Sequence, residues 1–305
     1  MTLPAQSLFI TGGRGRLARL IAAAFDHRSV GAQTCCALFS RQGGDGMASM
    51  EQLFGTGALA RCGTLLHLAW SSLPTTAEQH PELVETQDLP FLRRLLEAIT
   101  AVPASQRPHL VFFSSGGAVY GNAPGRSNGE SDPCRPIGQY GRAKRAAEML
   151  IESWADKHEF SHTILRISNP YGFTVHQERP QGIIPHAIRC ALAGTPLTLW
   201  GDGTARKDFI HSTDFLAALA RVLEERPSGT FNLCSGESHS LNEVLAEVER
   251  QTGRPIARIL SPAAVWDVHD SRLANDRLRA ASGWEPAINL REGIRLSVAG
   301  NLAPP

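Results

Sequence analysis

The chain has 305 residues, of which 42% are hydrophobic and 19% are charged, a composition typical of ordinary globular proteins. Its formal net charge is +1, so no electrostatic argument favours nucleic acid or an anionic membrane surface as a partner. No apolar run approaches the roughly 20 residues of a membrane span, and the N-terminus lacks the basic and apolar regions of a signal peptide. Together with six scattered cysteines, these features predict a cytoplasmic protein with reduced thiols.

The first motif along the chain is a glycine-rich turn between a predicted strand at 7–11 and a predicted helix at 15–25. It reads TGGRGRLA from Thr11. This context favours a cradle for a dinucleotide pyrophosphate, because the N–H groups and the positive dipole end of the helix would meet the anion. The alternative is a turn that only joins a strand to a helix. The cofactor-binding residues predicted in this turn are Gly12, Arg14, Gly15, Arg16 and Leu17.

Strand and helix signals alternate through the first two thirds of the chain, which predicts a Rossmann-like, doubly wound parallel α/β sheet. Further strands are expected at 35–40, 64–69, 110–114, 163–168 and 231–234. Further helices are expected at 83–101, 138–158, 183–194, 213–225 and 240–252. After residue 168, Pro and Gly interrupt the alternation and indicate a smaller substrate lobe. We expect a dinucleotide-binding domain at 1–168, to which 205–245 returns, and a discontinuous lobe at 169–204 and 246–305.

A tyrosine and a lysine, Tyr140 and Lys144, lie four residues apart in the predicted helix at 138–158. This spacing places both side chains on one helical face, one turn apart. An ammonium that close to a phenol favours the phenolate and lowers the tyrosine pKa from its ordinary value of about 10. Such a tyrosine can transfer protons near neutral pH, so we predict that the pair is catalytic. The alternative is a surface tyrosine beside a solvated lysine.

These motifs, in this order, resemble the extended short-chain dehydrogenase/reductase superfamily in its NAD-dependent epimerase/dehydratase branch. Further matching motifs are SSGGAVYG from Ser114, LRISNPYG from Leu165, WGDG from Trp200 and KDFIH from Lys207. The resemblance covers nearly the whole chain. It implies an enzyme in which Tyr140 is the acid and base for a sugar hydroxyl, while Lys144 bonds the nicotinamide ribose and holds the phenolate charge.

The third catalytic residue stays open in this resemblance. Relatives usually carry Ser or Thr at the position of Gly116, and here either Ser115 takes over the role or water or backbone does; we favour Ser115. Relatives that dehydrate or decarboxylate the sugar place acidic residues directly after this position. Gly117 and Ala118 cannot move a second proton, so the sequence favours epimerisation or simple reduction over dehydration.

The type of dinucleotide is a second open question. Enzymes that use NAD typically have Asp or Glu after the second strand, whereas this strand runs into Ser40 and Arg41, with no carboxylate before Asp45. A hydroxyl and a guanidinium suit a 2′-phosphate, unless Arg41 is simply a solvated surface residue. The predicted cofactor is NAD, with NADP as the alternative. Further cofactor-binding residues implied by the resemblance are Leu68, Ala69, Trp70, Asp88, Ser114 and Ile167, where Asp88 replaces a usual Asn.

The resemblance also implies a site for a nucleotide sugar. Asn169 would bond the diphosphate, and Thr198 and Trp200 would flank the nucleobase. Lys207 occupies the position of a phosphate-binding arginine, and Arg272 is the candidate for the second cation.

The resulting hypothesis is a nucleotide-sugar 4-epimerase of the UDP-hexose type, with no metal, acting as a homodimer through the helices at 83–101 and 138–158. One alternative is an NADPH-dependent reductase of a nucleotide-linked or other keto sugar. The other is a dinucleotide-binding regulator without catalytic activity.

Overall fold

The computed structural model describes residues 7–26, 36–55, 57–173 and 182–302, and the chain divides into two compact units. The first unit comprises residues 1–114, 142–165 and 222–230. The second unit comprises residues 115–141, 166–221 and 231–305. The chain therefore passes between the units after residues 114, 141, 165, 221 and 230, whereas the expected division has boundaries after residues 168, 204 and 245.

The central sheet has seven strands in the order β10-β6-β5-β4-β1-β2-β3. These strands are β1 (Leu8–Thr11), β2 (Cys36–Ser40), β3 (Ala48–Ser49), β4 (Thr64–His67), β5 (His109–Ser115), β6 (His162–Ile167) and β10 (Gly229–Leu233). β1 pairs in parallel with β2 on one side and with β4 on the other. The order therefore reverses beside β1, as in a doubly wound dinucleotide-binding sheet, and the predicted fold class is confirmed.

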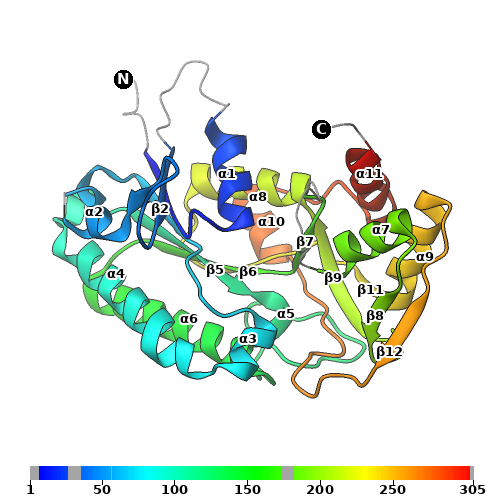
Figure 1. Ribbon diagram of the computed structural model, residues 1–305. Coiled ribbons are helices and arrows are strands. Elements are labelled where there is room, and N and C mark those ends of the chain that lie inside the picture. The colour runs from blue at the N-terminus through cyan, green and yellow to red at the C-terminus, as the bar shows by residue number, and fades with distance from the viewer. Residues whose placement is uncertain (1–6, 27–35, 56, 174–181, 303–305) are drawn as a thin grey trace. The chain divides into compact units, whose positions relative to one another are not determined.

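Helices cover both faces of this sheet (Figure 1). α1 (Arg16–Asp26) lies on one face, and α4 (Leu89–Ala101) and α6 (Gln139–His158) lie on the other. Four apolar residues on one face of α4 are completely buried in the core: Leu92, Leu95, Leu96 and Ile99. This stripe holds α4 against the sheet through the hydrophobic effect.

Two short α-helices, α2 (Met50–Gly55) and α3 (Pro74–Gln79), also belong to the first unit. A π-helical turn, Val84–Asp88, leads directly into α4. No helix in the described ranges is long and apolar enough to cross a membrane.

The second unit contains two small sheets and a core of its own. One sheet contains β11 (Ser238–Ser240), β9 (Arg206–His211) and β7 (Asn169–Tyr171), and the other pairs β12 (Arg258–Ser261) with β8 (Leu197–Trp200). Three helices bury their apolar sides together: α7 (Ile183–Ala193), α9 (Leu241–Thr252) and α11 (Leu290–Leu302). The remaining helices are α5 (Gly116–Val119), α10 (Asp276–Ser282) and α8 (Ser212–Glu225), whose last residues belong to the first unit.

Every strand and helix expected from the sequence is present, and all but one have ends within two residues of the expected ones. The exception is the helix expected at 83–101, where residues 84–88 form the π-helical turn and α4 begins only at Leu89. Cys35, expected to begin the second strand, lies outside the described residues. Most of the elements that were not expected are short, such as β3 and α2, because a few residues carry too little periodicity to indicate a structure. The exception is α11, a helix of 13 residues that the sequence analysis missed.

Candidate functional site

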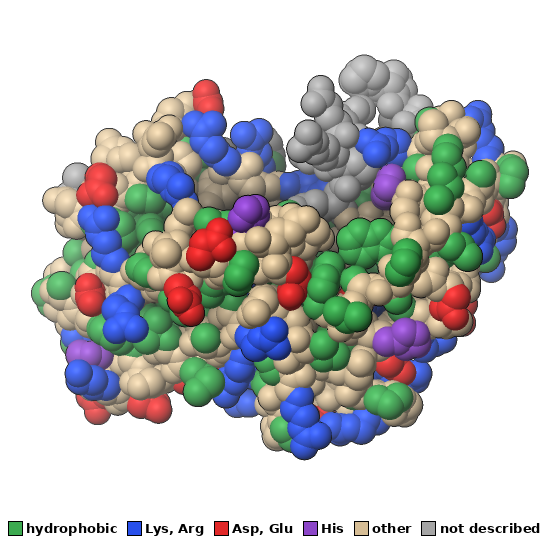
Figure 2. All heavy atoms as spheres, turned by 60° about the horizontal axis from the view of Figure 1, so that its bottom comes forward, with side chains coloured by type: hydrophobic (Ala, Val, Ile, Leu, Met, Phe, Trp, Pro, Cys, Tyr) green, Lys and Arg blue, Asp and Glu red, His purple; other side chains and the backbone are tan. Residues whose placement is uncertain are grey.

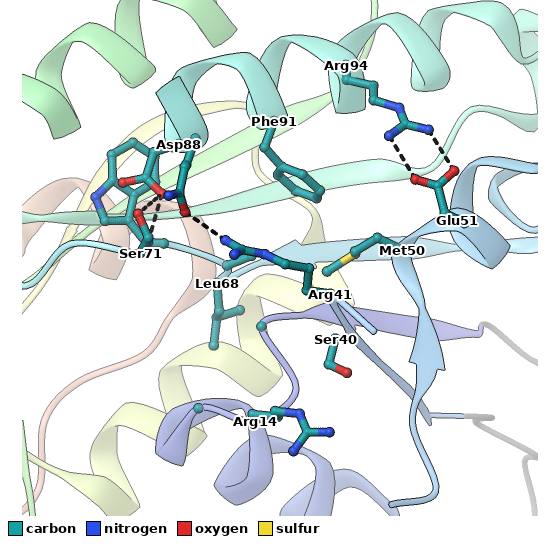
Figure 3. Close-up of a pocket in the computed structure, with 15 residues that line it drawn as sticks. Arg14, Ser40, Arg41, Met50, Glu51, Leu68, Ser71, Asp88, Phe91 and Arg94 are labelled. Carbon is teal, nitrogen blue, oxygen red and sulfur yellow. Dashed lines mark hydrogen bonds and ion pairs between the residues drawn. The ribbon is translucent and has the colours of Figure 1, made fainter. Parts of the chain in front are cut away.

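A cavity of about 540 Å³ opens in the first unit at the carboxyl ends of β1, β2 and β4 (Figure 3). We call it the first cavity. Its volume lies within the range of about 300–1,000 Å³ that is usual for small-molecule sites. The strand order reverses here, which is where open α/β sheets bind their ligands.

The glycine turn at the wall of this cavity has a geometry that a side chain would disrupt. Gly12 has a φ of 76°, and a Cβ on it would lie 2.8 Å from the backbone nitrogen of Ala69. The N–H groups of Gly13 and Gly15 donate to the carbonyls of Phe39 and Gly12, at 2.9 and 2.8 Å. α1 follows with no acidic residue in its first turn, so its positive end stays favourable to an anion. Shape and charge therefore fit the pyrophosphate of a dinucleotide.

Most of the predicted cofactor-binding residues line the first cavity. They are Gly12, Arg14, Gly15, Ser40, Arg41, Leu68, Ala69, Trp70 and Asp88. The predicted residues outside its lining are Arg16, Leu17, Ser114, Tyr140, Lys144 and Ile167. The lining also includes residues that the sequence analysis missed: Met50, Glu51, Ser71, Gln87, Phe91 and Arg94. Gln87 and Arg94 are polar residues of the helix predicted at 83–101, and this polarity was the only signal the sequence offered for part of this set.

Two carboxylates line the first cavity, and hydrogen-bond donors hold both of them. Glu51 accepts two bonds from Arg94, at 3.0 and 2.9 Å. Asp88 is buried and accepts from the N–H and Oγ of Ser71 at 2.7 and 2.8 Å and from Oγ of Ser72 at 3.1 Å. Asp88 ends the π-helical turn before α4, and such turns frequently occur at functional sites.

The proposed catalytic pair lies in the first two turns of α6. Tyr140 is half-buried and is the second residue of this helix, and Lys144 follows one turn later. Gly141 lies between them, and a Cβ on it would be 2.5 Å from the carbonyl oxygen of Ala118. Glycine therefore lets the first turn of α6 approach the backbone of the SSGGAVYG segment closely.

Lys144 is buried against aromatic residues of the first unit. Its Nζ donates to the carbonyl oxygen of Phe113 at 2.9 Å and lies 4.0 Å from the ring centroid of Trp70, which lines the first cavity. Burial lowers the pKa of Lys144 to about 7, although the charges of Asp88 and Glu148 act in the opposite direction. The lysine therefore changes its charge near neutral pH, whereas the sequence argument assumed a permanent ammonium.

This pKa predicts a pH-dependent stability. Below about pH 7, Lys144 is charged in both the folded and the unfolded chain, and the folded state pays the full cost of burying that charge. Between pH 7 and the ordinary lysine pKa of 10.5, the folded lysine is neutral while the unfolded one still holds its proton, so this cost disappears as the pH rises. Wild-type stability should therefore gain up to about 1.4 kcal/mol per pH unit from this group. Lys144→Met should lose this gain, and Lys157→Met, at an exposed position of the same helix, should keep it. Urea unfolding between pH 6 and pH 9.5 measures the slopes, and equal slopes in wild type and Lys144→Met would contradict the prediction.

Gly116 leaves only a tight space for the Ser or Thr that the resemblance leads one to expect. A Cβ on Gly116 would lie 2.6 Å from Cδ1 of Leu273 and 3.0 Å from the carbonyl oxygen of Arg166. Ser114 is buried and donates from Oγ to Glu148 at 2.5 Å. Ser115, half-buried at the end of β5, is the other serine of this segment.

A second cavity of about 200 Å³ lies in the second unit. Asn169 and Lys207, the two residues expected to bind a diphosphate, both line it. Nδ2 of Asn169 donates to the carbonyl oxygen of Asp208 at 2.8 Å, and Nζ of Lys207 donates to Asp267 at 2.7 Å. The structure thus brings the two expected residues together, with Lys207 paired to a carboxylate.

The other expected substrate residues do not line the second cavity. Thr198 and Trp200 lie on the exposed side of β8, where Trp200 contacts Trp266 edge to face. Arg272 donates to both carboxylate oxygens of Asp270, at 2.9 and 3.1 Å.

The sheet order, the glycine turn and the first cavity define a Rossmann-type dinucleotide-binding protein. Residues 8–234 match the model of the NAD dependent epimerase/dehydratase family, so the chain belongs to this family of extended short-chain dehydrogenase/reductase enzymes.

Known proteins similar to this chain include epimerases and reductases of nucleotide sugars. UDP-glucose 4-epimerase of Mycolicibacterium smegmatis is 27% identical over 235 residues, which are 77% of this chain and 74% of that protein. The dTDP-4-dehydro-6-deoxyglucose reductase of Escherichia coli is 29% identical over 186 residues, 61% of this chain and 58% of that one. The crystal structure of Thermus thermophilus UDP-glucose 4-epimerase in complex with NAD has a TM-score of 0.86 and 26% identity, covering 97% of this chain and 98% of that chain.

Proposed function

We propose that the protein is a nucleotide-sugar 4-epimerase that acts on a UDP-hexose. The enzyme would oxidise C4 to a ketone and reduce it again on the opposite face, with the dinucleotide bound throughout. The observation that carries the proposal is the position of Lys144, the partner of Tyr140 on α6, against Trp70 at the wall of the first cavity. The similarity to UDP-glucose 4-epimerases supports the same activity.

The first cavity would hold the dinucleotide through residues of three strand ends. Gly12 and Gly15 would hold the pyrophosphate at the start of α1, and Ser40 and Arg41 would face the adenosine ribose at the end of β2. When bound, the nicotinamide supplies the hydride acceptor and donor for C4.

The proton transfers would be carried out by Tyr140. Its phenolate would take the proton of the C4 hydroxyl during oxidation and return it during reduction. Lys144, in its charged form, would favour the phenolate of Tyr140. Ser115 would donate a hydrogen bond to the reacting oxygen. Gly117 and Ala118 offer no group for a second proton transfer, which supports epimerisation rather than dehydration.

The nucleotide sugar would bind mainly through residues of the second unit. Asn169 and Lys207 would hold the diphosphate, which would replace Asp267 on the lysine. Thr198 and Trp200 would flank the nucleobase. Arg272 would be the second cation once Asp270 releases it.

A homodimer through α4 and α6 forms part of this proposal. The outer side of these helices carries hydrophobic, basic and acidic side chains in mixture (Figure 2). One of the hydrophobic side chains is Met149 of α6, which is 56% exposed.

The proposal predicts interconversion without net redox change. Purified protein supplied with dinucleotide is expected to convert UDP-glucose and UDP-galactose, or their N-acetyl forms, into one another while the amount of reduced dinucleotide stays constant. Chromatography of the nucleotide sugars follows the conversion, and absorbance of the reduced nicotinamide follows the redox state. If none of the four sugars is converted, the proposal is wrong.

A second candidate function is NADPH-dependent reduction of a nucleotide-linked or other keto sugar. Ser40 and Arg41 at the end of β2 favour it, and so does the similarity to a dTDP-sugar reductase. In the same assay with keto sugars, this activity would consume one NADPH for each sugar reduced.

A further inference from the structure

We propose that the first cavity selects a 2′-phosphorylated dinucleotide over NAD, with Arg14, Ser40 and Arg41 as the residues that bind the 2′-phosphate. The inference rests on the proposed function only in taking this cavity as the dinucleotide site. It concerns residues of this chain in particular, because the family as a whole is described by its dependence on NAD.

Arg41 extends over the first cavity from the end of β2 and has a replaceable partner. Its Nη2 donates to Oε1 of Gln87 at 2.8 Å, in an exposed position (Figure 3). Within the described part of the chain, Arg41 pairs with no carboxylate. Because charge-assisted hydrogen bonds are about twice as strong as neutral ones, a phosphate can displace this amide.

Arg14 brings a second guanidinium to the same end of the cavity. Its Nη2 donates to the carbonyl oxygen of Gly43 at 3.0 Å, and the N–H of Gly43 donates to Oγ of Ser40 at 3.1 Å. In the view of Figure 3, Ser40 lies between the two arginines. Arg14 also lies 3.2 Å from Asp45, but the two side chains are 57% and 71% exposed, so solvent weakens this pair. Two guanidiniums thus lie near the hydroxyl of Ser40, which would exchange its 3.3 Å donation to the carbonyl oxygen of Gly43 for the phosphate.

The carboxylates of the first cavity are poorly placed to accept hydrogen bonds from the ribose hydroxyls of NAD. Among the described residues, the carboxylates that line this cavity are Glu51 and Asp88. Neither of them directly follows β2. Glu51 lies on α2 and pairs with Arg94, although this pair is also exposed, and the buried Asp88 accepts three bonds from Ser71 and Ser72. The end of β2 therefore provides positive charge and a hydroxyl where NAD enzymes provide a carboxylate.

Binding measurements on the protein freed of dinucleotide test this inference without any substrate. Calorimetric titrations with NADP⁺ and NAD⁺ are compared, together with 2′,5′-ADP and 5′-ADP, which differ from each other in the position of one phosphate. We expect NADP⁺ to bind at least about tenfold more tightly than NAD⁺, and added salt to reduce this ratio.

Single substitutions assign the preference to residues. Arg41→Gln and Arg14→Gln should each weaken the binding of NADP⁺ several-fold more than the binding of NAD⁺, so the preference for NADP⁺ falls. Arg93→Gln is the control, because Arg93 is exposed on α4 and does not line the cavity. Both Kd values should be unchanged in that variant.

Equal or tighter binding of NAD⁺ by the wild type would overturn the inference, and so would an equal loss for both dinucleotides in Arg41→Gln. If neither dinucleotide binds, the inference and the assignment of the cavity are both wrong. A protein that prefers NADP⁺ but converts no UDP-hexose would contradict the proposed epimerase alone. An active epimerase that prefers NAD⁺ would contradict the inference alone.

Discussion

Tyr140→Phe is expected to lower kcat by about two to four orders of magnitude, the usual contribution of a general acid or base. Phenylalanine keeps the half-buried ring at the start of α6 and removes only the hydroxyl that would carry the proton. The KM for the nucleotide sugar and the Kd for the dinucleotide should change little, because the lost interaction belongs to the reaction rather than to binding. Steady-state kinetics of the UDP-hexose interconversion, together with a dinucleotide titration, measure these values.

Tyr120→Phe is the matched control for this experiment. The hydroxyl of Tyr120 is buried in the second unit, where it donates to Asn232 at 2.7 Å and accepts from Arg166 at 2.8 Å. Removing it should lower the free energy of unfolding by about 1–3 kcal/mol and leave kcat within a few-fold of the wild type. A Tyr140→Phe enzyme with nearly normal kcat would show that another group moves the proton.

Gly12→Val is expected to weaken dinucleotide binding at least about 100-fold, because strain and steric overlap would displace the glycine turn. The φ of 76° disfavours a β-branched residue, and the added Cβ would lie 2.8 Å from the backbone nitrogen and 3.0 Å from Cα of Ala69. Backbone atoms at the end of a central strand cannot move aside as a flexible side chain can. Titration of the variant with both dinucleotides measures the loss.

Gly125→Val separates this effect from general destabilisation. Gly125 has a similar φ of 77°, but a Cβ on it meets no atom within 4 Å, and it belongs to the second unit. This variant should carry the conformational cost and keep its affinity for the dinucleotide. Thermal unfolding of both variants verifies that they fold, and a folded Gly12→Val protein with wild-type affinity would refute the role of the turn.

The parts of the fold that could be predicted are those with a long periodic pattern. The apolar residues of α4 recur at helical spacing over 13 residues, and the strand, glycine turn and helix at the N-terminus follow one another without interruption. The π-helical turn before α4 could not be predicted, because its hydrogen-bond pattern leaves no periodic signature. Glu51 was missed as a lining residue because it lies on a helix of only six residues.

The candidate site was predictable in its residue types but not in their surroundings. The spacing of Tyr140 and Lys144 is local, whereas the burial of Lys144 depends on Trp70 and Phe113, which come from distant parts of the sequence. Lys207 finds its partner Asp267 sixty residues later in the chain. Burial and ion pairs of this kind determine the charge of a side chain, and they arise only from the tertiary structure.

The close approach of Leu273 to Gly116 couples two positions that are far apart in the sequence. A protein with a side chain at both positions would need one of them to move, and a protein with a small residue at both would contain a void. A Ser or Thr at position 116 would therefore require the Cδ1 methyl of Leu273 to shift, or a smaller residue at position 273. We therefore expect the effect of a substitution at either position on stability to depend on the residue at the other.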